Sequence, residues 1–290
     1  MAMFTFNPSG QLSDLTETIF DLDKYSDLDP TFVSRYLVQA SILKAYKASN
    51  KIEKLRILDV GGAGSLIKEF IDVNLYIIDP KPNDNNDKNY TVGNALNMPF
   101  SDNEFDAVIT CDVLEHIKKE DRGQFIKECC RVSKELVVIA APFNLTGVRL
   151  AEISANNFYK KLTGENHVWL QEHLQDELPE LYQTKKQLAE LDMSNGHFSH
   201  TSLDYWQLLT RISFFMGLKT KEPILANDIK SINSFYLDKI MTKDFSVTGY
   251  RSFIVANKKD RVSIKKENDR YEPELENVFA LLSETILDLI

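Results

Sequence analysis

The sequence contains no long hydrophobic run. Its longest unbroken apolar stretch, residues 136–143, is far shorter than the roughly 20 apolar residues that cross a bilayer as a helix. The first residues, MAMFTFNPSGQLSDLTE, also lack the basic segment and the long apolar core of a secretory signal. We therefore expect a cytoplasmic protein without a transmembrane segment.

Cysteine is scarce as well, with 3 residues among 290. Cys129 and Cys130 are adjacent on an expected helix, and Cys111 ends an expected strand. The sequence therefore offers neither a disulfide framework nor a CxxC metal motif. We interpret all three cysteines as small buried side chains.

Basic residues are also in deficit. The chain has 43 acidic and 34 basic residues, and a net charge of −9 repels nucleic-acid phosphates. We therefore expect no nucleic-acid partner. The 43% of hydrophobic residues, by contrast, provide ample material for a folded core.

Short apolar runs are the main feature from residue 55 onward. They are apolar throughout rather than alternating, which is typical of strands covered on both faces. Their spacing predicts a doubly wound, Rossmann-like α/β fold with a mostly parallel, seven-stranded sheet. The expected strands are residues 55–60, 75–79, 89–92, 105–110 and 135–140, followed by 218–225 and 250–256 as a terminal antiparallel hairpin.

Interruptions of this rhythm divide the chain into five segments. Before the first strand, Asp29 and Pro30 form a good start for a helix. After the fifth strand, a helix-like insertion carries four of the five histidines. The segments are a helical cap (1–50), the strand-rich core (51–143), a lid or acceptor insertion (144–200), the completion of the core by a helix and the hairpin (201–257), and a basic linker with an amphipathic helix (258–290).

The final helix, residues 273–290, has an apolar seam with spacings of four and three residues. A helix of this length is marginal alone, so the seam must be buried. It packs either on its own domain or against a second copy or a partner helix. The seam consists of Leu275, Phe279, Leu282, Ile286 and Leu289.

A glycine-rich turn, DVGGAGS, follows the first expected strand at residues 59–65. Glycine lets a ligand approach the backbone closely, although such turns also use glycine for purely steric reasons. Asp79 ends the next strand, where a carboxylate can accept hydrogen bonds from both hydroxyls of a ribose. The turn differs from the dinucleotide-binding GxGxxG pattern, and Asp59 at its start suits a cationic ligand group.

Three ordered motifs, LRILDVGGAGSL, YIIDP and VGNALNMPFSDNEFDAVITCDVLEHI, resemble class I S-adenosylmethionine-dependent methyltransferases. The resemblance covers about residues 55–143 and is strongest to the branch that includes quinone-biosynthesis enzymes. It is also similar, less specifically, to methyltransferases of surface-polysaccharide pathways. The resemblance implies S-adenosylmethionine as cofactor.

The same resemblance implies a role for each residue that matches its motifs. Gly61 and its neighbours would lie under the methionine part of the cofactor, Asp79 would bind the ribose, and Asn94 would bind the adenine. Ala63 stands where the family usually has glycine, which requires a negative φ there. The implied cofactor-binding residues are Asp59, Gly61, Gly62, Ala63, Asp79, Pro80, Asn94, Ala95, Leu96, Cys111, Asp112 and Val113.

Methyl transfer to a hydroxyl needs a group that removes a proton as the oxygen attacks. We expect a lid histidine in this role, His200 or His197 first and His167 or His173 second, with His116 and Asp112 as alternatives from the core. The four lid histidines could also hold a metal. Their spacing fits no compact motif, so we predict no metal site.

The expected acceptor is a sugar or glycan intermediate that is methylated on oxygen. The sequence Cys111-Asp112-Val113-Leu114 stands where DNA adenine methyltransferases carry an Asn/Asp-Pro-Pro-aromatic tetrad, which argues against that substrate. The polar and aromatic composition of the lid suits a ring that bears hydroxyls. A quinone or another small molecule is the alternative acceptor, and a catalytically inactive cofactor-binding scaffold is the alternative to an enzyme.

Overall fold

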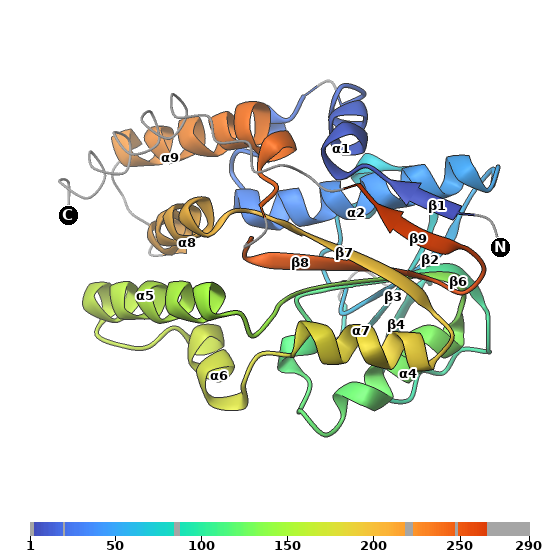
Figure 1. Cartoon of the computed structure of the whole chain (residues 1–290). Coiled ribbons are helices and arrows are strands. Elements are labelled where there is room, and N and C mark those ends of the chain that lie inside the picture. Colours follow the sequence, from blue (N-terminus) through green and yellow to red (C-terminus); the bar gives the residue numbers. More distant parts are fainter. Residues whose placement is uncertain (1–2, 20, 84–87, 218–222, 247–248, 266–290) are drawn as a thin grey trace.

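A seven-stranded sheet forms the centre of the computed structural model, which describes residues 3–19, 21–83, 88–217, 223–246 and 249–265. The strand order is β4-β3-β2-β5-β6-β8-β7. Figure 1 shows the sheet between its helices. Strands β4, β3, β2, β5 and β6 are parallel to one another, and β8 is antiparallel to both β6 and β7. The predicted Rossmann-like α/β fold is confirmed. The strands are β2 (Arg56–Val60), β3 (Asn74–Asp79), β4 (Tyr90–Val92), β5 (Phe105–Cys111), β6 (Ser133–Pro142), β7 (Ser194–His200) and β8 (Arg251–Asn257).

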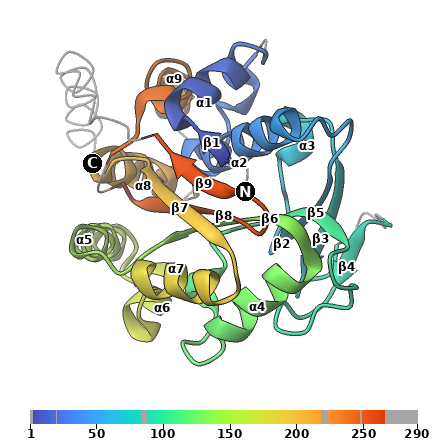
Figure 2. The same ribbon diagram turned by 45° about the vertical axis from the view of Figure 1, so that its right-hand side comes forward.

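Helices cover both faces of this sheet (Figure 2). Along β6, Val138 and Ala140 belong to the core that includes α2, whereas Val137 and Ile139 belong to the core that includes α4. Alternate residues of one strand therefore face two apolar layers, which is why the strands are apolar throughout. The helices are α1 (Pro8–Thr16), α2 (Pro30–Ser49), α3 (Ile67–Phe70), α4 (Arg122–Val132), α5 (Thr146–Thr163), α6 (Val168–Asp176), α7 (Leu181–Glu190), α8 (Leu203–Gly217) and α9 (Pro223–Phe235).

Helix α2 begins where the sequence predicts it. The carboxylate of Asp29 accepts hydrogen bonds from the backbone N–H groups of Thr31 (2.7 Å) and Phe32 (3.4 Å), and Pro30 occupies the first turn. The three cysteines are free and buried, as expected.

Within the described residues, no helix has the length and apolar character needed to cross a membrane.

The last strands differ from the prediction. The edge strand β7 is formed by residues 194–200, which we placed in the lid, and it pairs with β8 from Ser194–Asn257 to His200–Arg251. The prediction of a strand at residues 218–225 is wrong for residues 223–225, because Pro223 begins α9. Residues 218–222 lie outside the described part of the chain. The sequence did not predict strand β7 because its residues, SNGHFSH, are mostly polar. An edge strand that is only partly buried can have such a polar sequence.

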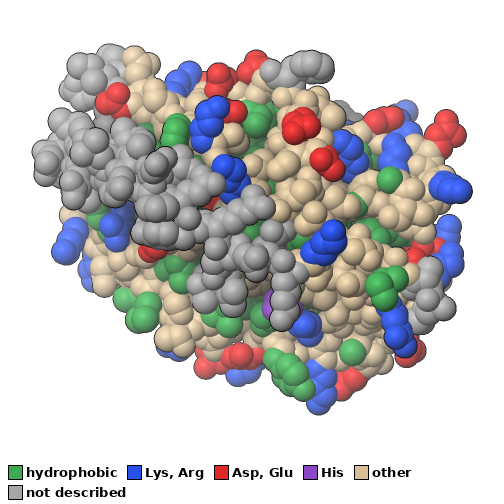
Figure 3. Space-filling view, turned by 45° about the horizontal axis from the view of Figure 1, so that its top comes forward, with side chains coloured by type: hydrophobic (Ala, Val, Ile, Leu, Met, Phe, Trp, Pro, Cys, Tyr) green, Lys and Arg blue, Asp and Glu red, His purple; other side chains and the backbone are tan. Residues whose placement is uncertain are grey.

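The expected linker also contains a strand. β9 (Arg261–Ile264) pairs in parallel with β1 (Met3–Phe6), so the two ends of the described chain lie side by side (Figure 2). The expected helix 273–290 lies outside the described residues. On the face shown in Figure 3, acidic and basic side chains are interspersed.

Candidate active site

The glycine-rich turn connects the carboxyl end of β2 to α3. Gly61 and Gly64 have φ values of 76° and 83°, whereas Ala63 is not among the residues with positive φ, as the resemblance requires. A Cβ atom on Gly61 would lie 2.3 Å from Cγ2 of Val113, and one on Gly62 would lie 2.4 Å from Cγ of Asp59. Only glycine fits at these two positions, because the turn packs directly on the end of β5 and on Asp59.

Asp59 lies beneath this turn and is 2% exposed. Its Oδ2 atom has no hydrogen-bond partner among the described residues. Burial raises the pKa of Asp59 to about 7, although Ser65 and the cation of Arg35 oppose the shift. A buried carboxylate with a free oxygen is well suited to an ammonium group of a ligand.

Asp79 and Asn94 lie at the next two strand ends. The Asp79 carboxylate accepts hydrogen bonds from the backbone N–H groups of Ala63 (3.4 Å) and Lys81 (2.9 Å) and thus joins two turns. Asn94 Oδ1 accepts a hydrogen bond from the N–H group of Leu96 (2.9 Å). Because β3, β2 and β5 are adjacent and parallel, the residues after Val60, Asp79 and Cys111 meet at one edge of the sheet.

Asp112 follows β5 at this edge and has a φ of 54°, a conformation that few residues other than glycine adopt. Two arginines hold its carboxylate. Arg251 donates from Nε to Oδ1 and from Nη2 to Oδ2, both at 2.6 Å, and Arg35 donates from Nη1 to Oδ2 at 2.5 Å. Although burial alone would raise it, the two guanidinium groups hold the pKa of Asp112 well below its usual range. The prediction of Asp112 as a general base is therefore corrected. A carboxylate with a strongly lowered pKa is a weak base, and both of its oxygens already accept hydrogen bonds from the two arginines.

His197 and His200, our first candidates for the base, lie on the edge strand β7. His200 is 1% exposed, with Nε2 at 2.9 Å from the carbonyl oxygen of Met241 and Nδ1 at 3.1 Å from the hydroxyl of Thr201. Burial lowers its pKa to about 4. His197 is exposed and its Nδ1 lies 3.0 Å from the ammonium of Lys185. Both ring nitrogens of His200 lie within hydrogen-bond distance of protein atoms, so we correct its assignment from general base to a structural role. His197 does not lie among the groups at the end of β5.

His167 stands at the start of α6, within an aromatic group. Its ring lies 4.9 Å from Tyr159, 5.0 Å from Phe214 and 5.6 Å from Trp169, measured between ring centroids. Burial lowers its pKa, and His173 adds to the shift. His167 thus packs among aromatic side chains near the start of the helix that also carries His173.

His173 and His116 come together beside the end of β5. His116 belongs to η2 (Leu114–His116), a short 3₁₀ turn that follows Asp112 and Val113. The centroids of the two imidazole rings are 5.1 Å apart. Glu115, His116 and His173 each offer an atom able to bind a ligand, and these atoms lie within 4.8 Å of one another. We call these three residues the acceptor cluster.

Two further side chains complete the surroundings of this cluster. Glu152 on α5 is 1% exposed, and its Oε1 lies 2.9 Å from Nδ1 of His173. The hydroxyl of Tyr250 donates to the same oxygen at 2.9 Å. Nε2 of His173 and Oε2 of Glu115 are buried and have no hydrogen-bond partner among the described residues. Sequence reasoning missed Glu152 and Tyr250, because nothing local marks residues that meet only in the folded chain.

Comparison with known proteins finds a family match for the part of the chain that contains the glycine-rich turn. Residues 58–140 match the family described as "Methyltransferase domain". The chain therefore contains a methyltransferase domain. S-adenosylmethionine is its cofactor.

Individual relatives share shorter or more distant similarity. Norajmaline N-methyltransferase of Rauvolfia serpentina is 43% identical over 44 residues, which are 15% of this chain and only 14% of that enzyme. The magnesium protoporphyrin IX methyltransferase of Synechocystis PCC 6803, solved with bound SAH, covers 78% of this chain and 84% of its own at 12% identity and a TM-score of 0.45. A putative sarcosine dimethylglycine methyltransferase from Galdieria sulphuraria covers 77% and 89% at 16% identity and a TM-score of 0.41.

The methyltransferase domain contains the whole glycine-rich turn, Asp79, Asn94, Glu115 and His116. Glu152, His173 and Tyr250 lie outside the matched residues. Glu115 and His116 of the acceptor cluster thus lie within the matched residues, whereas His173 on α6 lies outside them.

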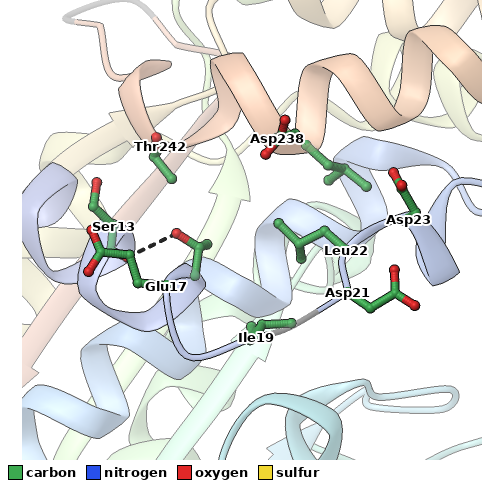
Figure 4. A pocket seen from close by; sticks show the side chains of 10 residues that line it. Ser13, Glu17, Ile19, Asp21, Leu22, Asp23, Asp238 and Thr242 are labelled. Atoms are coloured by element: carbon green, nitrogen blue, oxygen red, sulfur yellow. Dashed lines mark hydrogen bonds between the residues drawn. The ribbon is translucent and has the colours of Figure 1, made fainter.

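A hollow of 480 Å³ lies away from these groups, between α1 and the turns that follow α9 (Figure 4). It is lined by polar and acidic side chains and a few apolar ones. None of its lining residues belongs to the methyltransferase domain. They are Ser13, Thr16, Glu17, Ile19, Asp21, Leu22, Asp23, Leu237, Asp238 and Thr242.

Proposed function

We propose that this protein transfers the methyl group of S-adenosylmethionine to an oxygen of a polar, ring-containing acceptor bound at the acceptor cluster. The observation that supports this most directly is the course of the chain after β5. Val113 packs against Gly61 of the donor turn, and Glu115 and His116 follow within three residues. The donor turn and the acceptor cluster are therefore neighbours, as a direct transfer between two bound molecules requires.

On the donor side, each proposed contact follows from the chemistry of the cofactor. The free oxygen of Asp59 suits the ammonium of the methionine part, and the backbone of Gly61 to Ala63 lies under that part. Asp79 suits the ribose hydroxyls, and Asn94 with the backbone of Leu96 suits the adenine edge. Pro80, Ala95 and residues 111–113 complete the proposed lining.

The thiol of Cys111 is also suited to a position beside the sulfonium. Burial raises the pKa of Cys111 well above its usual value, and Asp112 adds to this shift. The thiolate is the nucleophilic form of cysteine, so a thiol that stays protonated does not compete with the acceptor for the methyl group.

On the acceptor side, the structure favours His116 and His173 over the other candidate histidines for activating the acceptor. One turn before His173 on α6, Trp169 is 64% exposed, and such an aromatic surface can stack on the face of a ring. Polar groups next to an exposed aromatic side chain support a sugar or glycan intermediate as the acceptor. A quinone or another small molecule remains the second candidate.

The test is a methyl-transfer assay on pools of acceptors. The intact protein is incubated with S-adenosylmethionine and either nucleotide sugars and oligosaccharides or phenols and quinols, and products are identified by mass. We expect methylated products from the sugar pool. Methylation confined to the phenol pool would reject the acceptor class but not the reaction. Cofactor binding without product from any pool would favour the inactive scaffold and reject the proposal.

A further inference from the structure

We propose that the acceptor cluster of Glu115, His116 and His173 binds a divalent transition-metal ion. The proposal deepens the proposed function, because it assigns to the acceptor end the group that activates the acceptor. The three ligand atoms lie within 4.8 Å of one another. Ligands at about 2.1 Å from an ion are roughly 3–4 Å apart, so side-chain shifts of a few tenths of an ångström to one ångström complete the site.

The orientation of both histidines supports this site. Nδ1 of His173 faces Glu152 at 2.9 Å, and Nδ1 of His116 faces Glu172 at 3.3 Å. Histidine ligands in metal sites usually donate their second ring N–H to a carboxylate, which fixes the tautomer and leaves the other nitrogen for the ion. Two histidines with this arrangement in one cluster point to a common ligand for their Nε2 atoms.

The unpartnered atoms point to the same ligand. Nε2 of His173 and Oε2 of Glu115 are buried and lack hydrogen-bond partners within the described chain. Glu115 is 2% exposed and forms no ion pair with a described residue. Buried polar atoms without partners are rare, and an ion between these two atoms would satisfy both.

The carboxyl groups around the cluster differ in their partners. Asp112 is held by ion pairs with Arg35 and Arg251. Glu152, in contrast, accepts hydrogen bonds from the hydroxyl of Tyr250 and from His173, and no lysine or arginine among the described residues forms an ion pair with Glu115 or Glu152. Glu115 therefore remains available as a metal ligand, and Glu152 remains available to orient His173.

Two imidazoles and one carboxylate suit zinc and its first-row neighbours and leave coordination positions open. An acceptor hydroxyl bound at such a position loses its proton to water more readily. Its oxygen then forms the bond to the methyl carbon as the carbon–sulfur bond breaks, and the electron pair of that bond stays on sulfur, giving neutral S-adenosylhomocysteine.

Metal binding is measured directly on the intact chain without a histidine tag. After removal of metals with a chelator and dialysis, the protein is titrated with Co²⁺, which is followed by its visible absorption, and with Zn²⁺, which is followed by calorimetry. We expect one ion per chain. Affinity should fall at least about tenfold in His116→Ala and in His173→Gln, and about 10–100-fold in Glu152→Gln, which removes the carboxylate behind His173.

His197→Ala is the matched control, because it removes an exposed histidine outside the cluster and should leave the affinity unchanged. Binding of S-adenosylmethionine, measured on the same variants, verifies that each one is folded. Absence of stoichiometric binding, or equal affinity in His116→Ala, His173→Gln and the wild type, would overturn the proposal. Methyl transfer that persists in chelator with no bound ion would overturn the metal site and leave the proposed function intact. A bound ion in a protein that methylates no acceptor would support the metal site and overturn the proposed function.

Discussion

The two sides of the carboxyl end of β5 are built in different ways. On the donor side, the glycine-rich turn, Asp79 and Asn94 follow three neighbouring strands in chain order, and each is positioned by its own turn. On the acceptor side, η2, α5, α6 and the start of β8 each contribute one or two side chains. The residues proposed to bind the cofactor are thus positioned by local motifs, whereas the residues proposed to act on the acceptor are brought together by long-range packing.

The largest expected effect separates the two sides most clearly. We expect His173→Ala to lower kcat roughly 10²–10⁴-fold, because it removes a group that activates the acceptor, and to leave the affinity for S-adenosylmethionine unchanged. Steady-state kinetics and calorimetry on one preparation measure both quantities, with His197→Ala as the control. A parallel loss of cofactor affinity would show that the two sides do not act independently.

Arg251 tests whether the two sides share a structural anchor. We expect Arg251→Met to lower the free energy of unfolding by about 3–5 kcal/mol, because it removes one partner of the buried ion pair with Asp112. Lys54→Met removes an exposed pair with Asp72 and should change stability by less than about 1 kcal/mol. Denaturant unfolding gives both values. Equal stability of the two variants would contradict an anchoring role for Arg251.

Asp79 tests the donor side alone. We expect Asp79→Ala to weaken cofactor binding by roughly 1.5–3 kcal/mol, because charge-assisted hydrogen bonds to the ribose are lost. Calorimetry on this variant and on Asp72→Ala, an exposed aspartate, provides the comparison. Unchanged affinity in Asp79→Ala would show that the proposed position of the cofactor is wrong.

Asp59 gives the smallest effect and a characteristic pH dependence. Its pKa of about 7 means that it is half protonated near neutrality, and only the ionised form attracts an ammonium group. Cofactor affinity should therefore fall about tenfold from about pH 7.5 to about pH 6, which is just over 1 kcal/mol. Asp59→Asn should flatten this profile. A wild-type affinity that does not change over this range would contradict the contact.

The same carboxylate affects the stability of the unliganded protein with the opposite sign. The folded state retains the Asp59 proton up to about pH 7, whereas the unfolded state releases it near its ordinary pKa. Between these values the folded state binds more protons, so stability decreases as pH rises. Thermal unfolding of unliganded Asp59→Asn should accordingly lack this part of the decrease.

Most of the fold, and the position of the donor-side residues at one edge of the sheet, were predictable because their signals are local. Asp29 and Pro30 start α2 regardless of what the helix packs on, and buried parallel strands are recognisable from their apolar runs. Strand β7 gave no such signal. His200 and His197 were the first two candidates for the base, but residues three apart on a strand point to opposite faces, so the two side chains lie on different sides of the sheet.

The acceptor side was not predictable for a different reason. Tyr250 donates to Glu152 across 98 residues of sequence, and His173 reaches the same carboxylate from another helix. Only the packing of α5, α6 and β8 against the sheet brings these side chains together. Glu115 and His116 were visible in the sequence, but their partners were not.

Strand β8 is the last strand of the large sheet in the chain, yet it lies between β6 and β7. While the protein is being synthesised, the edge of β6 therefore has no partner until residues 251–257 have left the ribosome. At roughly 5–20 residues per second, this interval lasts on the order of ten seconds. We therefore expect the nascent chain to expose an apolar strand edge for that time, and such an edge is a surface on which unfolded chains pair and aggregate.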